Sequence, residues 1–435
     1  MTCRYFSYQG NADWPTIEAW RASRQEPEPG IEQSVKDILT EVRTRGDQAL
    51  VSFNRKFDCP DFSLQQLRVP EKARTRAMEL VSRNDLDLIL EAAENIRSFH
   101  QNQKERSWIS HESPGLTTGQ LINPVNRAGL YIPGGRSGDT PLVSSLLMNA
   151  VPAQVAGVKE IILTSPPGKD GNLNPLTLAS AHVLGITEIF AVGSAWAVGG
   201  LAYGTESIPR VDMIAGPGNI FVTTAKRLLF SRTGIDMVAG PSEVVILADS
   251  TAKPKWLAAD LLSQAEHDPL ASAVVISPDP RILQDVAREL NQQLDQLPRK
   301  EIAGQSLESF GALIQVPELT TGLELANQLA PEHLQLCIHD PWSMIGAVQN
   351  AGAVFLGHYC PESLGDYFAG PNHVLPTLGT ARFTSGLSVQ HFCKKTSLIA
   401  ADQDYFARSA GKIARLARLE GLEAHARSAE IRTRT

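Results

Sequence analysis

Two short segments of the chain carry polar side chains that could bind a metal or move a proton. The segment SQAEHD closes an apolar helical pattern, and Gln264 and His267 lie three residues apart, so they share one helix face. They could hold a metal, although His267 could equally cap the helix C-terminus. The segment APEHL puts Glu332 beside His333 just before an apolar β run. This pair suits general acid–base chemistry or water activation, unless it is only a solvated turn.

Two later segments hold further candidate ligands. The loop GDYFAGPNH contains Asp366 and His373, and loops after strands often carry functional groups. Near the C-terminus, LEGLEAH separates Glu420 from His425 by five residues. On a regular helix these two side chains would point about 140° apart. They can serve one site only if Gly421 breaks the helix or the ligand lies between them, and otherwise His425 is a surface residue.

Glycine-rich turns mark candidate ligand sites of another kind. Tyr131 opens the segment YIPGG directly after a β run, where glycines would let a ligand approach the backbone. The segment GPGN at 216–219 joins a β run to a helix, and the free N–H groups of a helix N-terminus suit a phosphate. No complete GxGxxG motif occurs, because Phe221 stands where the third glycine would fall. Each turn alone could be a plain strand-to-helix connection.

The elements that would position these residues follow an alternating pattern. Short apolar β runs recur with helical patterns between most of them, which predicts an α/β fold with mostly parallel sheets. About nine runs exceed what one small sheet usually holds, so two α/β domains are expected. The runs are Gly129–Ile132, Glu160–Thr164, Glu188–Val192, Asp212–Ala215, Val244–Ala248, Ala273–Ser277, Ala312–Val316, Leu334–Ile338 and Ala353–Leu356.

The flanking regions differ from this alternating centre. Residues 1–30 are polar and predict an arm with a linker, and Ile31–Phe57 and Glu71–Gln103 show helical spacing of apolar residues. Residues 105–127 predict a short hairpin. After Thr384 no strand is expected, and 397–435 predict a helical appendage that is rich in Lys and Arg near its end.

Composition argues against several classes of protein. The 435 residues carry 40 Lys and Arg against 47 Asp and Glu, for a formal charge of -7, and 43% are hydrophobic. This profile argues against disorder and against nucleic-acid binding. The most apolar stretch, 142–158, is interrupted by polar residues, so no membrane-spanning segment is expected. We read no signal peptide, and five scattered cysteines without a CxxC motif favour free thiols in the cytoplasm.

Together and in order, these motifs resemble the histidinol dehydrogenase family. The resemblance runs from about Ser34 to Arg432 and is carried by YIPGG, LAYGTE, AGPGN, DMVAGPSE, LLSQAEHD, APEHL, GDYFAGPNHVLPT and LEGLEAH. It implies two incomplete Rossmann-like α/β domains with small N-terminal and helical C-terminal extensions, in an intertwined homodimer. Accordingly we expect an arm at 1–30, a first α/β domain with the zinc and catalytic motifs at 31–127 plus 236–383, a second α/β domain on the NAD side at 128–235, and an extension at 384–435 that reaches the partner subunit.

The resemblance implies a zinc- and NAD-dependent enzyme that oxidises L-histidinol through L-histidinal to L-histidine, the last step of histidine biosynthesis. In the family pattern His333 takes the alcohol proton and Glu332 activates water for the second oxidation. The zinc ligands would be Gln264, His267 and Asp366, together with His425 of the partner subunit. The substrate contacts would be Ser242, Gln264, His267, His333, Asp366, Glu420 and His425. The NAD contacts would be Tyr131, Trp196 and Asn219.

Two departures from the family pattern concern NAD. Trp196 stands where many members carry the glutamine of GGAQA, so it could stack on a ring but loses the hydrogen bond. Arg136, in a segment after Gly135 that looks longer than usual, could contact an NAD phosphate.

Three alternatives stay open. The first is a related zinc- and NAD-dependent dehydrogenase of another primary alcohol such as a sulfonated diol, which the Glu420 carboxylate would repel. The second is a zinc hydrolase with Glu332 as its base. The third is a two-domain binding protein without chemistry, against which the Glu332–His333 pair counts.

Overall fold

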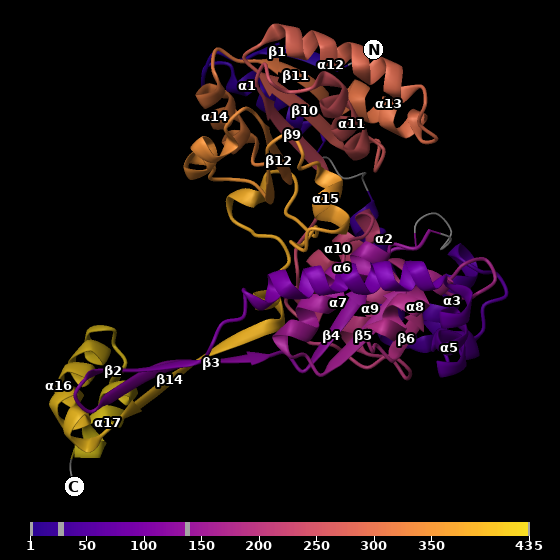
Figure 1. Ribbon diagram of the computed structural model, residues 1–435. Helices are drawn as coiled ribbons and strands as arrows, with labels where there is room; N and C mark the ends of the chain where they lie inside the picture. Colours follow the sequence, from indigo (N-terminus) through magenta and orange to yellow (C-terminus); the bar gives the residue numbers. More distant parts are fainter. Residues whose placement is uncertain (1–2, 25–29, 135–139, 434–435) are drawn as a thin grey trace. The chain divides into compact units, whose positions relative to one another are not determined.

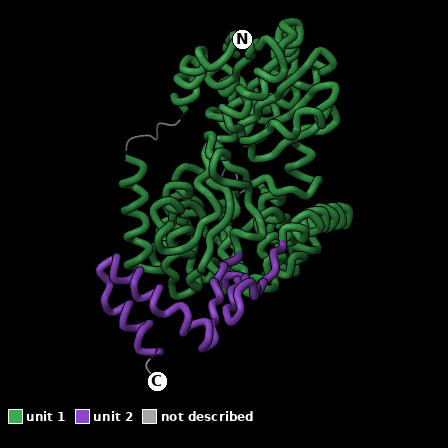
Figure 2. The backbone as a smooth tube through the Cα atoms, turned by 90° about the vertical axis from the view of Figure 1, so that its left-hand side faces the viewer, with its two compact units in different colours: residues 1–103, 126–392 green, residues 104–125, 393–435 purple. Residues whose placement is uncertain are grey.

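The computed structural model describes residues 3–24, 30–134 and 140–433 (Figure 1). The chain divides into two units (Figure 2). The first unit comprises residues 1–103 and 126–392 and contains two parallel sheets. The second unit comprises 104–125 and 393–435 and contains one antiparallel sheet with helices.

The six-stranded sheet of the first unit is parallel throughout, in the order β1-β11-β10-β9-β12-β13. β9 and β10 read EVVILA and SAVVIS and are buried along their whole length, as strands covered on both faces must be. The direction of strand addition reverses between β9 and β12. The strands are β1 (Arg4–Ser7), β9 (Glu243–Ala248), β10 (Ser272–Ser277), β11 (Gly311–Gln315), β12 (His333–Cys337) and β13 (Ala353–Leu356).

Helices cover both faces of this sheet. Alternate residues of β9 therefore pack into two separate apolar clusters. Val244 and Ile246 belong to the cluster formed with α11 (Pro254–Ala265), α12 (Pro280–Leu294) and α13 (Lys300–Phe310). Val245 belongs to the cluster formed with α1 (Trp14–Ala22) and α14 (Leu319–Leu329). The connections carry α15 (Glu362–Tyr367) and 3-10 helices at Pro341–Ala347, Thr380–Arg382 and Val389–Phe392.

The five-stranded sheet is also parallel, in the order β6-β5-β4-β7-β8. Its direction of strand addition reverses between β4 and β7. The strands are β4 (Arg127–Tyr131), β5 (Glu160–Ser165), β6 (Glu188–Ala191), β7 (Met213–Ala215) and β8 (Gly234–Ile235). The helices between and beside them are α7 (Val143–Ala156), α8 (Pro175–Val183), α9 (Ser194–Tyr203) and α10 (Ile220–Leu229). All nine predicted β runs are strands, displaced by two residues at most, and the α/β class is confirmed.

The expected boundaries of the two α/β domains differ from the packing. The helices between residues 31 and 101 contact the helices of the five-stranded sheet, and Arg68 forms a bridge with Phe190 of β6. Grouping these helices with 236–383 was therefore wrong, because an amphipathic pattern shows which face is buried and not on what. The arm contributes β1 to the six-stranded sheet. The helices are α2 (Ile31–Arg45), α3 (Asp47–Phe57), α4 (Leu64–Leu67), α5 (Glu71–Leu80) and α6 (Arg83–Gln101).

The second unit is built on an antiparallel sheet in the order β14-β3-β2. β2 (Trp108–Ser113) and β3 (Leu116–Pro124) form the predicted hairpin. β14 (Cys393–Ala401) pairs with β3 along its whole length, so the expectation of no strand after Thr384 was wrong. This strand is largely exposed, and its polar first half gives no apolar run to detect. Helices α16 (Gln403–Leu419) and α17 (Glu423–Glu430) and a 3-10 helix at Ile431–Thr433 follow.

The apolar helices of the fold are short. Within the described ranges, none combines the length and the hydropathy that crossing a membrane requires.

Candidate active site

The catalytic pair expected from the sequence lies at the amino end of β12, next to the amino end of β9. His333 of β12 pairs in register with Val244 of β9, so β9 begins one residue earlier. Glu243 therefore lies before the paired residues. On the side of β12 its backbone N–H and carbonyl face the side chains of Glu332 and His333 instead of a backbone partner. Its N–H donates to Glu332 Oε2 at 2.9 Å, and its carbonyl oxygen lies 3.1 Å from His333 Nδ1. One backbone residue thus holds both members of the pair.

Burial sets the protonation of this pair. Loss of solvent raises the pKa of Glu332 well above its usual range, and the nearby Glu243 carboxylate adds to the increase. Hydrogen bonds from the Glu243 N–H and the Ser242 side chain act in the opposite direction. Burial lowers the pKa of His333 to about 3, so its ring is neutral at pH 7.

The tautomer of His333 follows from its neighbours. A carbonyl oxygen can only accept, so Nδ1 carries the hydrogen toward Glu243 and Nε2 carries the lone pair. Nε2 is buried and has no hydrogen-bond partner among the described residues. Its nearest carboxylate oxygen, on Asp366, is 3.9 Å away. Nε2 is therefore free to accept a proton from a bound molecule.

Three side chains beside this pair form a candidate metal group. Ligand atoms of His267, Glu362 and Asp366 lie within 4.8 Å of one another. Glu362 and Asp366 are four residues apart on α15, so they share one helix face. Nitrogen and carboxylate oxygen donors suit Zn²⁺. Burial raises the pKa of Asp366 to about 7 and that of Glu362 well above its usual range.

Gln264 is fully buried at the end of α11 and adjoins this group. One atom of its side-chain amide lies 2.9 Å from Glu362 Oε2 and 3.1 Å from His333 Nδ1. His373 also lies beside Asp366, with its Nδ1 3.1 Å from the Asp366 carbonyl oxygen. The structure thus gathers these residues with the catalytic pair in one cluster.

Glu362 belongs to this cluster although the sequence analysis did not single it out. Its spacing of four residues from Asp366, in a segment short enough for one helix, was the available signal.

The residues expected to contact NAD lie on the five-stranded sheet. Tyr131 ends β4, next to β7, and its hydroxyl accepts from the Ser194 N–H at 3.3 Å. Gly216 follows β7 with φ +125°, and a Cβ there would lie 2.0 Å from the Tyr131 carbonyl oxygen. Only glycine fits this close approach. Asn219 caps α10, because its Oδ1 accepts from the N–H groups of Phe221 and Val222. This cap positions the turn and occupies the Asn219 oxygen.

Trp196 is a core residue rather than an exposed ring. It is 5% exposed and stacks on Phe53 and Phe57, each with its ring centroid 5.4 Å away. Its indole N–H donates to Asn54 Oδ1 at 2.9 Å. The indole N–H is therefore already used within the protein, and a contact between Trp196 and NAD stays a prediction. Arg136, the other departure, lies outside the described residues.

Comparison with known proteins shows to which family this chain belongs. The model of the histidinol dehydrogenase family matches residues 21–433. The chain belongs to the histidinol dehydrogenase family.

Individual relatives agree over the full length. The histidinol dehydrogenases of Oleidesulfovibrio alaskensis and Nitratidesulfovibrio vulgaris are each 56% identical over 432 residues, covering 99% of this chain and 100% and 99% of theirs. The crystal structure of histidinol dehydrogenase from Elizabethkingia anophelis superposes with a TM-score of 0.92 at 37% identity, covering 99% of this chain and 98% of that one. The resemblance inferred from the motifs is confirmed.

Two residues of the histidinol dehydrogenase pattern lie in the second unit. α16 ends at Leu419, Gly421 takes φ +75°, and α17 begins at Glu423. The glycine therefore breaks the helix between Glu420 and His425, which removes the objection that regular helical geometry raised. Both side chains are exposed. Their roles as a substrate contact and a metal ligand stay predictions.

Proposed function

We propose that this chain is a zinc- and NAD-dependent oxidoreductase that converts L-histidinol through L-histidinal to L-histidine, completing histidine biosynthesis. Family membership along nearly the whole chain supports the activity. The observation that carries the mechanism is the buried Glu332–His333 pair, held by Glu243 beside the His267–Glu362–Asp366 group.

The first oxidation needs a neutral base at the substrate hydroxyl. His333 Nε2 has a free lone pair and no competing partner among the described residues. It takes the hydroxyl proton while the carbinol carbon transfers hydride to NAD⁺, which gives the aldehyde and NADH. A histidine buried as a neutral ring is suited to this role because it does not need to lose a proton first.

The second oxidation needs water at the aldehyde carbon. Glu332 as the carboxylate takes a proton from that water as the oxygen attacks, and the hydrated carbon transfers hydride to a second NAD⁺. The products are the carboxylic acid, NADH and a proton. Burial raises the pKa of Glu332, and a base with a raised pKa binds the transferred proton more strongly.

The metal group fits zinc by its donor chemistry. His267 and Asp366 would hold the ion, with Gln264 and with His425 of the partner subunit as the resemblance implies, and Glu362 completes the acidic surroundings. When bound, zinc would fix the amine and imidazole of the substrate as a Lewis acid. The surplus negative charge of Glu362 and Asp366 would be balanced by this cation.

A homodimer is part of the proposal. Large apolar side chains are exposed on the second unit, and contiguous apolar surface marks protein contacts more often than it marks solvent-facing structure. A second copy of the chain would cover them and supply its own Glu420 and His425. The exposed side chains are Trp108, Ile109, Leu121, Ile399, Ile413, Leu416, Leu419 and Ile431.

The cytoplasm is the proposed location, and all five cysteines are unpaired, as expected in a reducing compartment.

The test is NADH production by purified, zinc-loaded protein supplied with L-histidinol. We expect two NADH per histidinol, lost with a chelator and restored by zinc. Production of one NADH would contradict the second step. Activity only with another primary alcohol, such as a sulfonated diol, would favour the alternative substrate class, against which the named relatives and the Glu420 carboxylate count.

A further inference from the structure

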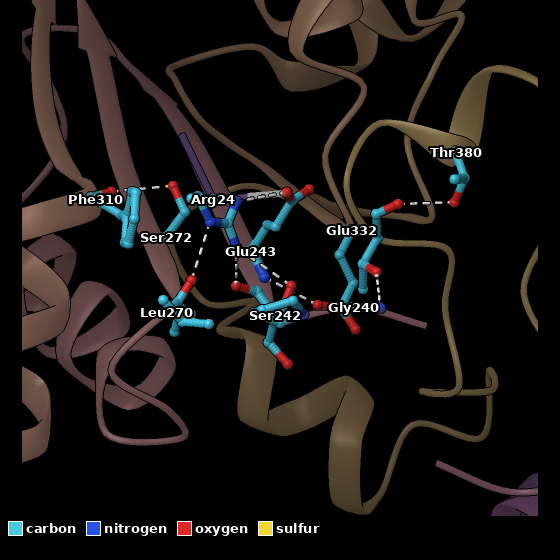
Figure 3. A network of polar contacts seen from close by, with 12 residues as sticks. Arg24, Gly240, Ser242, Glu243, Leu270, Ser272, Phe310, Glu332 and Thr380 are labelled. Carbon is cyan, nitrogen blue, oxygen red and sulfur yellow. Dashed lines mark hydrogen bonds and ion pairs between the residues drawn. The ribbon is translucent and has the colours of Figure 1, made fainter. Parts of the chain in front are cut away.

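A buried arginine from the N-terminal segment reaches the backbone that holds the catalytic pair. Arg24 lies just beyond α1 and is 5% exposed. Its Nη1 forms an ion pair with Glu243 Oε1 at 2.6 Å, and the side chain of Glu243 is equally buried. No residue of the arm was assigned to the site by the sequence analysis. Figure 3 shows the pair to one side of Glu332.

All three nitrogens of the guanidinium form hydrogen bonds or an ion pair. Nε donates to the Leu270 carbonyl at 2.9 Å, and Nη2 donates to the carbonyls of Pro241 and Ser242, each at 3.3 Å. The planar fork therefore fixes the segment entering β9 and the segment entering β10 together. The ring of Phe310, 5.5 Å from Cζ, covers one side.

The residues that Arg24 fixes are the ones that hold the catalytic groups. Glu243 gives its N–H to Glu332 and its carbonyl to His333 through the backbone, while its carboxylate goes to Arg24. A buried carboxylate without a partner would move toward water or take a proton. Either change would shift the Glu243 backbone, and both catalytic side chains depend on it.

We propose that Arg24 is a positioning residue for both oxidations, acting through Glu243 on Glu332 and His333. This inference rests on the catalytic roles proposed above for that pair. Arg24 does not touch the reacting atoms. Its contribution is to hold the Glu243 side chain in place, so that the N–H aimed at the Glu332 carboxylate and the carbonyl aimed at the imidazole hold their directions.

The test uses full-length, zinc-loaded Arg24→Met, with each oxidation assayed separately on histidinol and on histidinal. We expect kcat per zinc-loaded subunit to fall about 10- to 100-fold in both, as for a misplacement of catalytic groups by a fraction of an ångström to 1 Å. KM for histidinol should change less than threefold, because the metal group is untouched. Arg24→Lys keeps the charge but loses the fork, and should fall between Arg24→Met and the unaltered enzyme.

A double variant separates positioning from general stability. If Arg24 acts through Glu332, Arg24→Met combined with Glu332→Gln should oxidise histidinal no more slowly than Glu332→Gln alone. Fully multiplicative losses would overturn the inference. The matched control is Asp47→Asn, which disturbs a buried carboxylate that accepts from the Thr205 and Ser207 hydroxyls, away from the site. It should lower Tm and leave kcat unchanged.

The outcomes are distinguishable. Unchanged kcat in folded Arg24→Met, with only a lower Tm, overturns the positioning role. Should Arg24→Met not fold, Arg24→Lys decides by the same criterion, and unchanged kcat there overturns it. If Glu332→Gln and His333→Asn keep full turnover, the proposed catalytic roles fail, and the inference about Arg24 fails with them.

Discussion

The two parallel sheets of the first unit present chemistry at opposite ends of their strands. In the five-stranded sheet the glycine-rich turns follow the carboxyl ends of β4 and β7, where the direction of strand addition reverses. That is the usual ligand edge of an open α/β sheet. In the six-stranded sheet the reversal lies between β9 and β12, yet Glu243 and His333 are the first residues of these strands. The proposed catalytic cluster therefore lies at the amino edge.

Helix polarity explains why the two edges suit different ligands. At the carboxyl edge helices begin, as α10 does after the GPGN turn, and helix N-termini favour anions such as the phosphates of a dinucleotide. At the amino edge the helices that lead into β10 and β12 end, and the short helix α15 begins there at Glu362. α11 ends at Ala265 before His267, and α14 ends at Leu329 before Glu332. Helix C-termini favour cations, so this edge suits a metal ion and an amine substrate.

The largest expected effect is on the amino edge. His333→Asn keeps the size of the side chain but removes the base, so we expect kcat for histidinol oxidation to fall about 1,000-fold. Zinc content and the CD spectrum serve as controls and should match the unaltered enzyme. Turnover close to normal in this variant would contradict the assignment of His333.

The second prediction concerns the metal. His425→Asn removes the ligand that the resemblance assigns to the partner subunit, so zinc affinity should fall about 10- to 100-fold, in the range seen when a metal site loses supporting groups. Zinc content after dialysis against a chelator series measures this. Unchanged zinc content would remove His425 from the ligand set and leave His267, Glu362 and Asp366 as the group.

The third prediction tests the carboxyl edge. Gly216→Ala puts a methyl group against the Tyr131 carbonyl and strains a left-handed residue, so KM for NAD should rise about 10-fold with kcat nearly unchanged. Gly185→Ala is the control, because Gly185 also has positive φ but no atom within 4 Å of the added carbon. It should lower stability only. Equal KM values in both variants would contradict a dinucleotide at this turn.

The smallest expected effect is at Trp196. Trp196→Phe leaves Asn54 Oδ1 without its donor in the core, which should lower the free energy of unfolding by about 2 kcal/mol. Denaturant unfolding measures this loss. KM for NAD should stay unchanged, since the ring is buried and packs on Phe53 and Phe57. A raised KM for NAD with an unchanged free energy of unfolding would support Trp196 as an NAD contact.

Strands were predictable where burial on both faces makes them continuous apolar runs. EVVILA and SAVVIS are examples, and Glu332 lies just before β12 as predicted, whereas His333 is the first residue of that strand. The sequence did not predict β1 and β14, because both strands are largely exposed and form by pairing with strands that are distant in the sequence. The partners of α2–α6 were misassigned because helical periodicity carries no information about the partner surface.

The candidate site was predictable only in part. Adjacent Glu332 and His333 suggested proton transfer from the sequence alone, but their shared dependence on Glu243 needed the register of β9 against β12. A substitution at a ligand position looks like a changed contact in the sequence, and the hydrogen bond of Trp196 to Asn54 and its stacking on two phenylalanines gave no local signal. Arg24, at 219 residues from Glu243 in sequence, gave no local signal.

The central claim is that one amino-edge cluster performs both oxidations with different bases. Glu332→Gln tests it directly, by counting NADH formed per histidinol and assaying histidinal formation in the same sample. We predict one NADH per histidinol with histidinal formed, because His333 still removes the alcohol proton while no carboxylate activates water. Two NADH per histidinol at normal rate, or equal loss of both oxidations, would contradict the division of labour between Glu332 and His333.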